Sequence, residues 1–225
     1  MVPEFGITRS LMPAAAQSAQ AEMATVYIVD DDAAVRESLC LLVESVGLRA
    51  AAFGSAADFL EQCSPVSAGC IVLDIRMPGI SGLELQERLC AAGITLPVII
   101  ITGHGDITMA VRAMKAGAMD FIQKPFSDQE LLDQIHLALE RDAQIRADRA
   151  RFESVKQRAS SLSPRERTVM DLVVSGMSNK AIASELGLSQ KTVEVHRAHV
   201  MDKMQAGSLA ELVQMCILGG KQRPN

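Results

Sequence analysis

The feature that most constrains the fold is an alternation of short apolar runs with longer amphipathic stretches between Thr25 and Ile122. Parallel strands need crossover connections, which are usually helical, so this alternation predicts a parallel sheet. Five repeats are present, and the runs around Ile28, Val72 and Ile100 are almost wholly apolar. Such runs are typical of central strands that helices cover on both faces. We therefore expect an α/β domain with a five-stranded, parallel, doubly wound sheet.

The strands and helices of this domain can be placed by periodicity and by capping residues. We expect strands at Thr25–Val29, Leu48–Phe53, Cys70–Leu73, Val98–Ile101 and Met119–Ile122. We expect helices at Ala34–Val46, Ser55–Gln62, Gly82–Ala91 and Ile107–Ala116. Three helix starts, at Ser81 with Glu84, at Ser127 with Glu130 and at Ser163 with Glu166, match the S/T-x-x-E pattern of a capping box.

A second, all-helical domain is expected after the sheet. The stretch between Pro125 and Pro164 contains no Gly or Pro, so one long helix, or two abutting helices, can run from Ser127 toward Ser160. Charged positions such as Asp142 interrupt its heptad spacing, and we interpret it as a solvated connector rather than a coiled coil. Shorter helices should follow at Pro164–Ser175, Asn179–Leu186, Gln190–Met204 and Leu209–Leu218.

These patterns divide the chain into four segments. Residues 1–23 are expected to be a disordered extension or a cloning remnant, because they lack the apolar core of a secretory signal. The α/β domain should span 24–139 and a helical linker 140–160. The small helical domain should span 161–225.

Composition excludes several classes of protein. Hydrophobic residues at 48% and charged residues at 22% argue against a disordered or fibrous chain. The five cysteines form no C-x-x-C pair, which disfavours a zinc site or a disulfide framework, and we expect reduced thiols in a cytoplasmic protein. The longest apolar runs, such as Val98–Ile101, fall far short of the roughly 20 residues that cross a bilayer, so no membrane span is expected.

The net charge of -5 is unevenly distributed. Residues 160–225 contain eight basic and six acidic side chains, which leaves 14 of the 22 basic and 21 of the 27 acidic residues for the rest. The C-terminal third is therefore the only candidate for contact with nucleic acid, although a net charge of +2 alone is a weak signal.

Polar side chains follow four of the predicted strands: Asp30, Asp31 and Asp32, then Asp74, Thr102 and Lys124. The carboxyl ends of parallel strands meet at one edge, where open α/β sheets place their functional crevice. Crowded carboxylates raise one another's pKa unless a cation neutralises them, and Mg²⁺ fits an all-oxygen set. Asp74 is the best placed nucleophile for a phosphoryl group. Alternatively, the first aspartates only cap the next helix and Lys124 is a surface charge; agreement among four strand ends favours the site.

Four motifs resemble the receiver domain of bacterial two-component response regulators, whose fold is flavodoxin-like. They are VDDD at 29–32, VLDIRMPG at 72–79, ITGHGD at 101–106 and FIQKPF at 121–126, and the similarity covers about residues 24–145. The third motif together with MKAGAMDF at 114–121 is similar to the FixJ/NarL type.

The resemblance implies that a sensor histidine kinase phosphorylates Asp74. It also implies a Mg²⁺ ion bound by Asp31, Asp74 and the backbone carbonyl of Arg76, with Asp30 acting through water. Thr102 and Lys124 would neutralise the charge on the phosphoryl oxygens during transfer to Asp74.

The resemblance further implies a conformational switch made of Thr102 and Phe121, and a cis bond at Lys124–Pro125. If the switch repacks the helix and strand between Ile107 and Ile122, it can create a dimer face, for which we expect Val111 and Lys115.

The helical domain contains a helix-turn-helix pattern, with a turn at Gly187 and a helix cap at Ser189. The segment from SLSPRERT to HVMDKM is similar to the LuxR-type DNA-binding domain, and the similarity covers most of residues 160–218. Four residues of the second helix should face inward: Val193, His196, Val200 and Met204.

Residues expected at the DNA are Lys180, Lys191, Thr192, Glu194, Val195, Arg197 and Ala198. Lys180 and Arg197 should reach the phosphate backbone. Glu194 and Ala198 stand where many relatives have basic residues, so base contacts are not assigned to them.

The predicted function is a phosphorylation-activated, DNA-binding transcriptional regulator. Its expected partners are a sensor histidine kinase, double-stranded promoter DNA, RNA polymerase and, when phosphorylated, a second copy of the chain. We expect no enzyme activity beyond self-catalysed phosphotransfer to Asp74 and slow self-dephosphorylation.

Three alternatives are open at this point. A phosphatase of the haloacid-dehalogenase type would need a second Asp two positions after Asp74, where this chain has Arg76. A nucleotide-binding Rossmann role lacks the third glycine after Gly103 and Gly105. A phospho-switched protein-binding module would use the helical domain without touching DNA.

Overall fold

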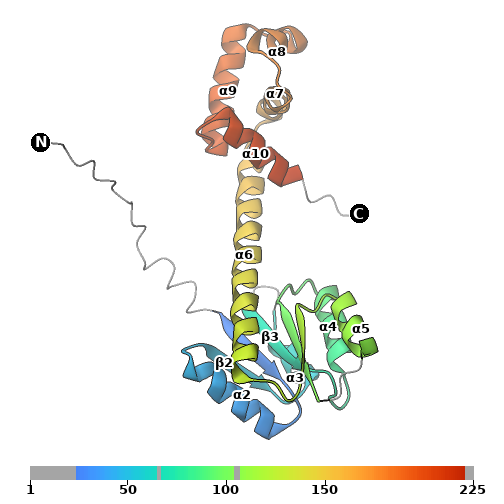
Figure 1. The fold of residues 1–225 in the computed structure, drawn as a ribbon. Helices are drawn as coiled ribbons and strands as arrows, with labels where there is room; N and C mark the ends of the chain where they lie inside the picture. The colour runs from blue at the N-terminus through green and yellow to red at the C-terminus, as the bar shows by residue number, and fades with distance from the viewer. Residues whose placement is uncertain (1–23, 65–66, 104–106, 221–225) are drawn as a thin grey trace, which may run out of the picture. The chain divides into compact units, whose positions relative to one another are not determined.

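The structure is a computed structural model that describes residues 24–64, 67–103 and 107–220, without side chains for 218–220. The predicted extension at 1–23, and residues 104–106 of the third motif, lie outside the described residues. The chain divides into two compact units, one ending at Ile145 and the other beginning at Arg146. We describe each unit by itself, with the labels of Figure 1.

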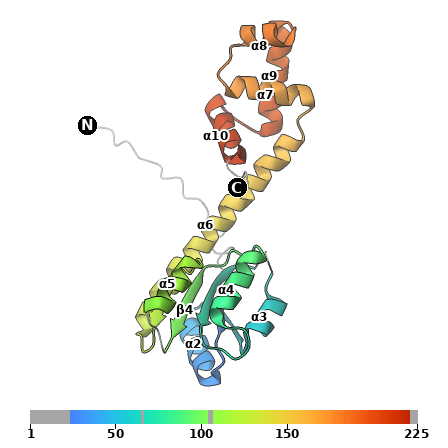
Figure 2. The same ribbon diagram turned by 90° about the vertical axis from the view of Figure 1, so that its right-hand side faces the viewer.

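The first unit contains the predicted parallel sheet, and helices pack on both of its faces (Figures 1 and 2). The strands are β1 (Thr25–Val29), β2 (Arg49–Phe53), β3 (Gly69–Asp74), β4 (Val98–Thr102) and β5 (Asp120–Gln123). They lie in the order β2-β1-β3-β4-β5, and every pairing is parallel. Each predicted strand is confirmed to within one residue at either end. All residues of β3 and β4 are buried, as their apolar composition predicted.

The helices of this unit are α2 (Ala33–Ser45), α3 (Ala56–Gln62), α4 (Gly82–Ala91), α5 (Ile107–Lys115) and the first part of α6 (Asp128–Ser160). One core cluster joins α3, α4 and α5 to the sheet through residues such as Phe59 and Leu85. A second cluster joins α2 and α6 to the opposite face through residues such as Leu39 and Ile135. Strand side chains alternate between these clusters, so both faces of the sheet are covered.

The start of α6 is anchored to the sheet by Asp142, which we had wrongly interpreted as part of a solvated connector. Its side chain is only 2% exposed, and Oδ2 accepts a hydrogen bond from the backbone N–H of Gly69 at 2.9 Å. Gly69 has a φ of +134°, and a Cβ atom there would lie 1.8 Å from the carbonyl oxygen of Thr25. Only glycine can therefore occupy this position.

The second unit holds the end of α6 and four shorter helices. These are α7 (Pro164–Val174), α8 (Asn179–Leu186), α9 (Gln190–Met204) and α10 (Leu209–Gly220). Their core includes Val169, Ile182, Val193, Val200 and Leu212. The turn between α8 and α9 starts at Gly187, whose φ of 64° is left-handed, so the predicted helix-turn-helix is present.

Capping residues start most of these helices, with one difference from expectation. Ser163 and Glu166 form the full reciprocal capping box that the sequence predicted. Ser81 caps α4, but the Glu84 carboxylate accepts from Arg88 at 2.7 Å instead of returning to Ser81. Asp32 caps α2 by accepting from Ala34 and Val35, so the capping interpretation is right for this one aspartate.

None of the helices in the described part of the chain is long and apolar enough to cross a membrane.

Candidate functional site

The structure brings together the residues that follow strands β1, β3 and β5. Asp30 follows β1, Asp74 is the last residue of β3, and Lys124 follows β5. The Nζ atom of Lys124 lies 2.8 Å from Oδ2 of Asp30 and 3.3 Å from Oδ1 of Asp74. Parallel pairing of β1, β3, β4 and β5 places these three strand ends at the same edge. The single ammonium group of Lys124 therefore forms ion pairs with two buried carboxylates.

This arrangement leaves excess negative charge at Asp74. Burial raises the pKa of the Asp74 carboxyl above its ordinary value; the Lys124 ammonium opposes the rise, and the charge of Asp30 adds to it. Burial alone would lower the pKa of Lys124, but the hydrogen bond and charge of Asp30, with the charge of Asp74, raise it above the ordinary value. Lys124 stays protonated at neutral pH, and the site favours a further cation.

Asp30 is held more tightly than the sequence indicated. Its side chain is 2% exposed, and Oδ1 accepts from the backbone N–H of Asp32 at 2.9 Å. The Arg36 guanidinium donates to the backbone carbonyl of Asp30 at 2.7 Å. We did not predict this contact of Arg36. Arg36 lies four residues after the cap of α2, and this spacing of one helical turn could have indicated that its side chain lies near the start of the helix.

Asp31 is exposed and lines an open cleft of about 770 Å³ with the loop that follows Asp74. Arg76 and Met77 belong to that loop, and the Arg76 backbone N–H donates to Oδ2 of Asp74 at 2.7 Å. The Asp31 side chain and the loop after Asp74 therefore line the same open cleft.

These groups are the hard oxygen ligands that suit Mg²⁺. Among the residues described, no three side chains of His, Cys, Asp or Glu are grouped for metal binding. Mg²⁺ does not need three, because in proteins it typically takes one or two carboxylates and completes its shell with water and phosphate oxygens. The donor set around Asp74 fits this ion.

The predicted switch residues lie on the two neighbouring strands. Thr102 is buried at the end of β4, and its carbonyl accepts from the Lys124 N–H at 2.8 Å. Phe121 is half-buried in β5 against the core that α3, α4 and α5 share with the sheet. The Lys124–Pro125 peptide bond is cis, as the resemblance implied.

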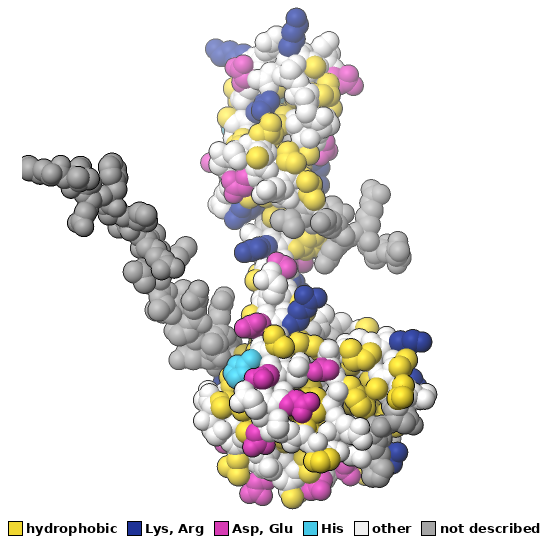
Figure 3. Space-filling model, in the orientation of Figure 1, with side chains coloured by type: hydrophobic (Ala, Val, Ile, Leu, Met, Phe, Trp, Pro, Cys, Tyr) yellow, Lys and Arg dark blue, Asp and Glu magenta, His cyan; other side chains and the backbone are white. Residues whose placement is uncertain are grey.

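Apolar side chains are exposed on α5, where we predicted a dimer face. Ile107 is 85% exposed, Val111 45% and Met114 47%, and Lys115 is exposed beside them. Figure 3 shows hydrophobic side chains gathered over α4 and α5. Apolar residues clustered in this way are characteristic of an interaction surface.

In the second unit, most of the predicted DNA-facing residues are exposed. The exposed ones are Lys180, Lys191, Glu194, Val195 and Ala198. Thr192 is half-buried, and its hydroxyl lies 2.8 Å from that of Ser189. Figure 3 shows Lys and Arg side chains projecting from the end of this unit that carries α8.

Arg197, which we expected to reach the phosphate backbone, is bound to another residue of this unit. It is half-buried, and Nη1 donates to Oδ1 of Asn179 at 2.7 Å, which joins α9 to the start of α8. His196, which we expected to face inward, is half-buried, while Val193, Val200 and Met204 are buried as predicted.

Sequence reasoning missed one charged cluster altogether. Glu166 is buried, and beyond its capping role it accepts from Lys203 at 2.6 Å and lies 3.6 Å from Nδ1 of His199. The Lys203 hydrogen bond, followed by the backbone N–H of Ser163, lowers the pKa of Glu166 to about 2. This cluster ties α7 to the end of α9.

Comparison with known proteins agrees with both units. Residues 26–136 match the family described as "Response regulator receiver domain", and residues 160–216 match "Bacterial regulatory proteins, luxR family". The transcriptional regulatory protein FixJ of Azorhizobium caulinodans is 52% identical over 88% of this chain and 94% of its own length. Nodulation protein W of Bradyrhizobium diazoefficiens is 51% identical over 85% of each chain.

Solved structures give the same result. The response regulator StyR superimposes with a TM-score of 0.80 at 48% identity, over 87% of this chain and 98% of its own. Full-length FixJ from B. japonicum gives 0.54 at 45% identity, over 88% and 97%. The chain therefore belongs to the FixJ/NarL-type response regulators, which are phosphorylation-dependent transcription regulators with a receiver domain and a LuxR-type DNA-binding domain.

Proposed function

We propose that a sensor histidine kinase transfers a phosphoryl group to Asp74, and that this transfer controls binding of the α8–α9 unit to promoter DNA. The observation that carries the proposal is the shared contact of Lys124 with Asp30 and Asp74 at the carboxyl ends of β1 and β3. A buried carboxylate beside one ammonium group is suited to phosphoryl transfer, which needs a nucleophile and charge neutralisation.

In the proposed reaction, an Asp74 carboxylate oxygen attacks the phosphorus of a phosphohistidine. A new P–O bond forms, the P–N bond breaks, and the departing imidazole nitrogen keeps the electron pair and takes up a proton. Lys124 stabilises the charge on the phosphoryl oxygens, as does the hydroxyl of Thr102. Slow self-dephosphorylation follows when water attacks the same phosphorus and Asp74 leaves as a carboxylate.

A Mg²⁺ ion is the proposed cofactor. Asp31, Asp74 and the backbone carbonyl of Arg76 would hold it, with Asp30 acting through water. When bound, the ion supplies positive charge that neutralises the carboxylates and the phosphoryl oxygens. Asp30, whose carboxylate contacts Lys124 at 2.8 Å, would keep that ammonium beside the phosphoryl group.

Phosphorylation adds roughly -1.5 to -2 units of charge to Asp74, and we propose that Thr102 and Phe121 respond to it. Thr102 would move toward the phosphoryl group, and Phe121 would occupy the space that it leaves. The surface affected is α5, where Val111 and Lys115 would form the contact with a second, phosphorylated copy.

The proposed DNA contacts are Lys180, Lys191, Thr192, Glu194, Val195, Arg197 and Ala198. Of these, Lys180 and Arg197 would bind phosphates, and Arg197 would be positioned by its hydrogen bond to Asn179. RNA polymerase is a further proposed partner, and the protein would act in the cytoplasm, where the kinase and the DNA are both accessible.

We keep 161–225 as the proposed DNA-binding domain and move the proposed boundary between the receiver (24–139) and the linker (140–160). The buried contact of Asp142 with Gly69 argues for a receiver that extends further into α6 than residue 139. We place the beginning of the linker near residue 146 for the design of variants, in line with the limit of the first compact unit.

The test is phosphorylation and DNA binding of Asp74→Asn. The amide is no nucleophile but nearly preserves the packing, so incubation with acetyl phosphate and Mg²⁺ should add no phosphoryl mass to the intact protein. The wild-type chain should gain one phosphoryl group and bind promoter DNA more tightly. Phosphorylation of Asp74→Asn to the wild-type level would contradict the assignment of the acceptor. Equal DNA binding by phosphorylated and unphosphorylated wild type would contradict the control of DNA binding.

A further inference from the structure

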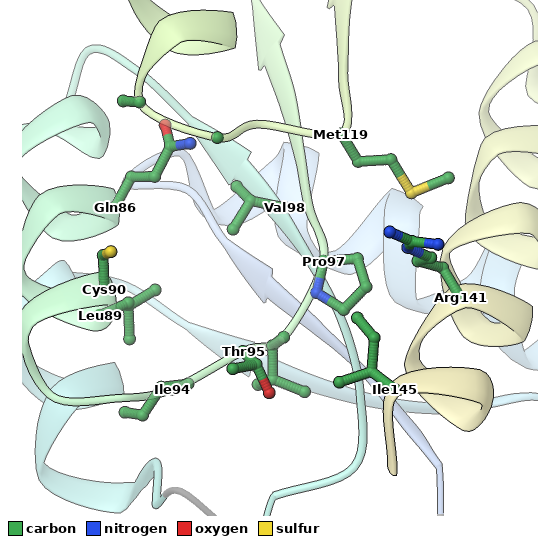
Figure 4. A pocket seen from close by; sticks show the side chains of 13 residues that line it. Gln86, Leu89, Cys90, Ile94, Thr95, Pro97, Val98, Met119, Arg141 and Ile145 are labelled. Atoms are coloured by element: carbon green, nitrogen blue, oxygen red, sulfur yellow. The ribbon is translucent and has the colours of Figure 1, made fainter. Parts of the chain in front are cut away.

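A second concave site lies at the edge of the receiver sheet opposite Asp74. It has a volume of about 440 Å³ and is formed by α4, the segment that leads into β4, the turn before β5, and α6. Figure 4 shows Gln86 and Leu89 on one side, Arg141 and Ile145 on the other, and Pro97 and Val98 between them. The volume falls within the roughly 300–1,000 Å³ that is usual for small-molecule sites.

The wall of this pocket is mostly apolar. Leu89, Ile94, Val98, Met119 and Ile145 contribute hydrophobic side chains. A small-molecule site combines such a wall with a few polar groups that orient the ligand. This pocket therefore has the apolar wall of a small-molecule site. Its polar groups determine which kind of molecule it can bind.

Two polar side chains stand on opposite sides of the apolar wall. Arg141 is exposed, and among the residues described its guanidinium has no hydrogen bond or ion pair. Gln86 is 4% exposed; its Nε2 donates to the carbonyl of Ala113 at 3.3 Å, while its Oε1 has no partner within the described part of the chain. An unpaired cation beside an apolar wall is the feature expected of a site for an anionic ligand group, whereas the Gln86 oxygen is buried, can only accept a hydrogen bond and therefore offers nothing to an anion.

The α6 side of the pocket is held in place by Asp142. This residue lies between Arg141 and Ile145 in sequence, and its buried carboxylate accepts from the Gly69 N–H at 2.9 Å. The bond ties the first part of α6 to the beginning of β3. The backbone that carries Arg141 is therefore held against the sheet, and a ligand need not order this part of α6.

We propose that this pocket binds a small apolar carboxylate. Its hydrocarbon body would lie against the wall formed by Leu89, Val98 and Met119, and its carboxylate would pair with Arg141. A guanidinium binds a carboxylate through two parallel N–H···O bonds, which makes arginine selective for this head group. The site does not include any residue of the phosphorylation centre, so its test is independent of the function proposed above.

Cys90 provides a local readout, because it lines the pocket and is exposed. The experiment measures the rate at which iodoacetamide alkylates Cys90 in the full-length protein, by peptide mass spectrometry. Octanoate is the probe, and 1-octanol is the matched molecule without the carboxylate. Cys40, on α2 outside the pocket, is the internal reference in the same sample.

Octanoate is expected to slow the alkylation of Cys90 in a saturable manner while Cys40 is unaffected, and 1-octanol should be much less effective. In Arg141→Gln, the octanoate concentration that gives half-maximal protection should rise about tenfold, the usual scale for a lost charge-assisted hydrogen bond. Arg149→Gln is the matched control, because Arg149 is an exposed residue of the same helix outside the pocket, and it should behave like wild type.

Three results would overturn the proposal: no protection of Cys90 by octanoate, equal protection by 1-octanol, or unchanged protection in Arg141→Gln. Because Arg141 is exposed, its replacement should leave the fold intact, and far-ultraviolet circular dichroism of each variant checks this.

Discussion

The Nζ atom of Lys124 is closer to Asp30, at 2.8 Å from Oδ2, than to the proposed phospho-acceptor Asp74, at 3.3 Å. Asp30 is almost completely buried and has no other cation at its carboxylate among the described ion pairs. The lysine therefore has a structural role at Asp30 in addition to its proposed role at the phosphoryl group.

The first prediction concerns Lys124→Met, which should destabilise the receiver by about 2–3 kcal/mol, since it leaves a buried carboxylate without its partner. Tyr27 is the only tyrosine, the chain has no tryptophan, and Tyr27 lies in β1, so its fluorescence during urea unfolding reports on this unit alone. Divalent ions should be removed with a chelator, because a bound cation would replace part of the lost charge.

The control for this prediction is the double-mutant cycle with Asp30→Asn. Removing the Asp30 charge as well should recover about 1–2 kcal/mol of the loss, because the two residues contact each other directly. If the two losses simply add, the 2.8 Å contact contributes nothing to stability.

A second prediction follows from the buried cluster at Glu166. Its folded pKa of about 2 lies below the ordinary value of 4.5, so the stabilisation is fully present above pH 4.5 and is lost as the pH falls toward 2. Glu166→Gln should therefore be less stable than wild type at pH 5, and the difference should shrink by pH 3. Amide hydrogen exchange in α7 and α9, corrected for the intrinsic rate at each pH, measures the difference.

Two further groups face Glu166 and must be considered in that experiment. The Nζ atom of Lys203 lies 2.6 Å from Oε2 of Glu166, and Nδ1 of His199 lies 3.6 Å from Oε1. Glu185→Gln, at an exposed position of α8, is the matched control and should show no such change between pH 5 and pH 3. A constant gap between Glu166→Gln and wild type over this range would contradict the prediction.

The third prediction separates two kinds of DNA contact. Lys180→Ala should weaken binding to all sequences and reduce the slope of log K against log salt by about one, the effect of one lost phosphate contact. Asn179→Ala removes the acceptor that positions Arg197, so it should weaken binding in the same sequence-independent manner. Fluorescence anisotropy over a range of salt concentrations measures both effects.

Lys156→Ala, on the exposed surface of α6, is the control and should leave DNA affinity unchanged. If Lys180→Ala altered only the preferred sequence, Lys180 would contact bases rather than phosphates.

The fourth prediction concerns the exposed surface of α5. Beryllofluoride, a phosphoryl mimic, should convert the wild-type chain from monomer to dimer, because the acyl-phosphate state is expected to repack this helix. Val111→Asp combined with Lys115→Glu should keep the chain monomeric while Asp74 still accepts phosphate. Size-exclusion chromatography with light scattering measures the mass in each state. A wild-type monomer both with and without beryllofluoride would rule out dimerisation as the switch.

The sequence predicted the fold accurately because the decisive signals are local. Strand β3 is apolar throughout and α9 begins at a capping serine, so their bounds needed no knowledge of tertiary contacts. The convergence of Asp30, Asp74 and Lys124 also followed from local signals, because topology alone brings the ends of parallel strands together.

The contacts that the sequence could not predict join residues far apart in the chain. The sequence pattern places Asp142 as a charge on a solvated helix. Only the folded chain shows that its carboxylate accepts a hydrogen bond from the Gly69 N–H. Similarly, Glu166 was identified as a cap, but its contact with Lys203 depends on how α7 packs against α9. A buried charge is tolerated only when another group pairs with it, and which group does so depends on how the helices pack.

The contact between Gly69 and Asp142 also has a consequence for how this chain can vary. No side chain fits at position 69, so the amide donor there is present in every foldable variant. Variation can enter the pair only through position 142, where asparagine could still offer an oxygen but a hydrophobic residue would leave the amide without that acceptor. Backbone geometry thus prevents any substitution at position 69. Natural variation in how α6 is attached to the receiver must therefore arise at residues of the helix.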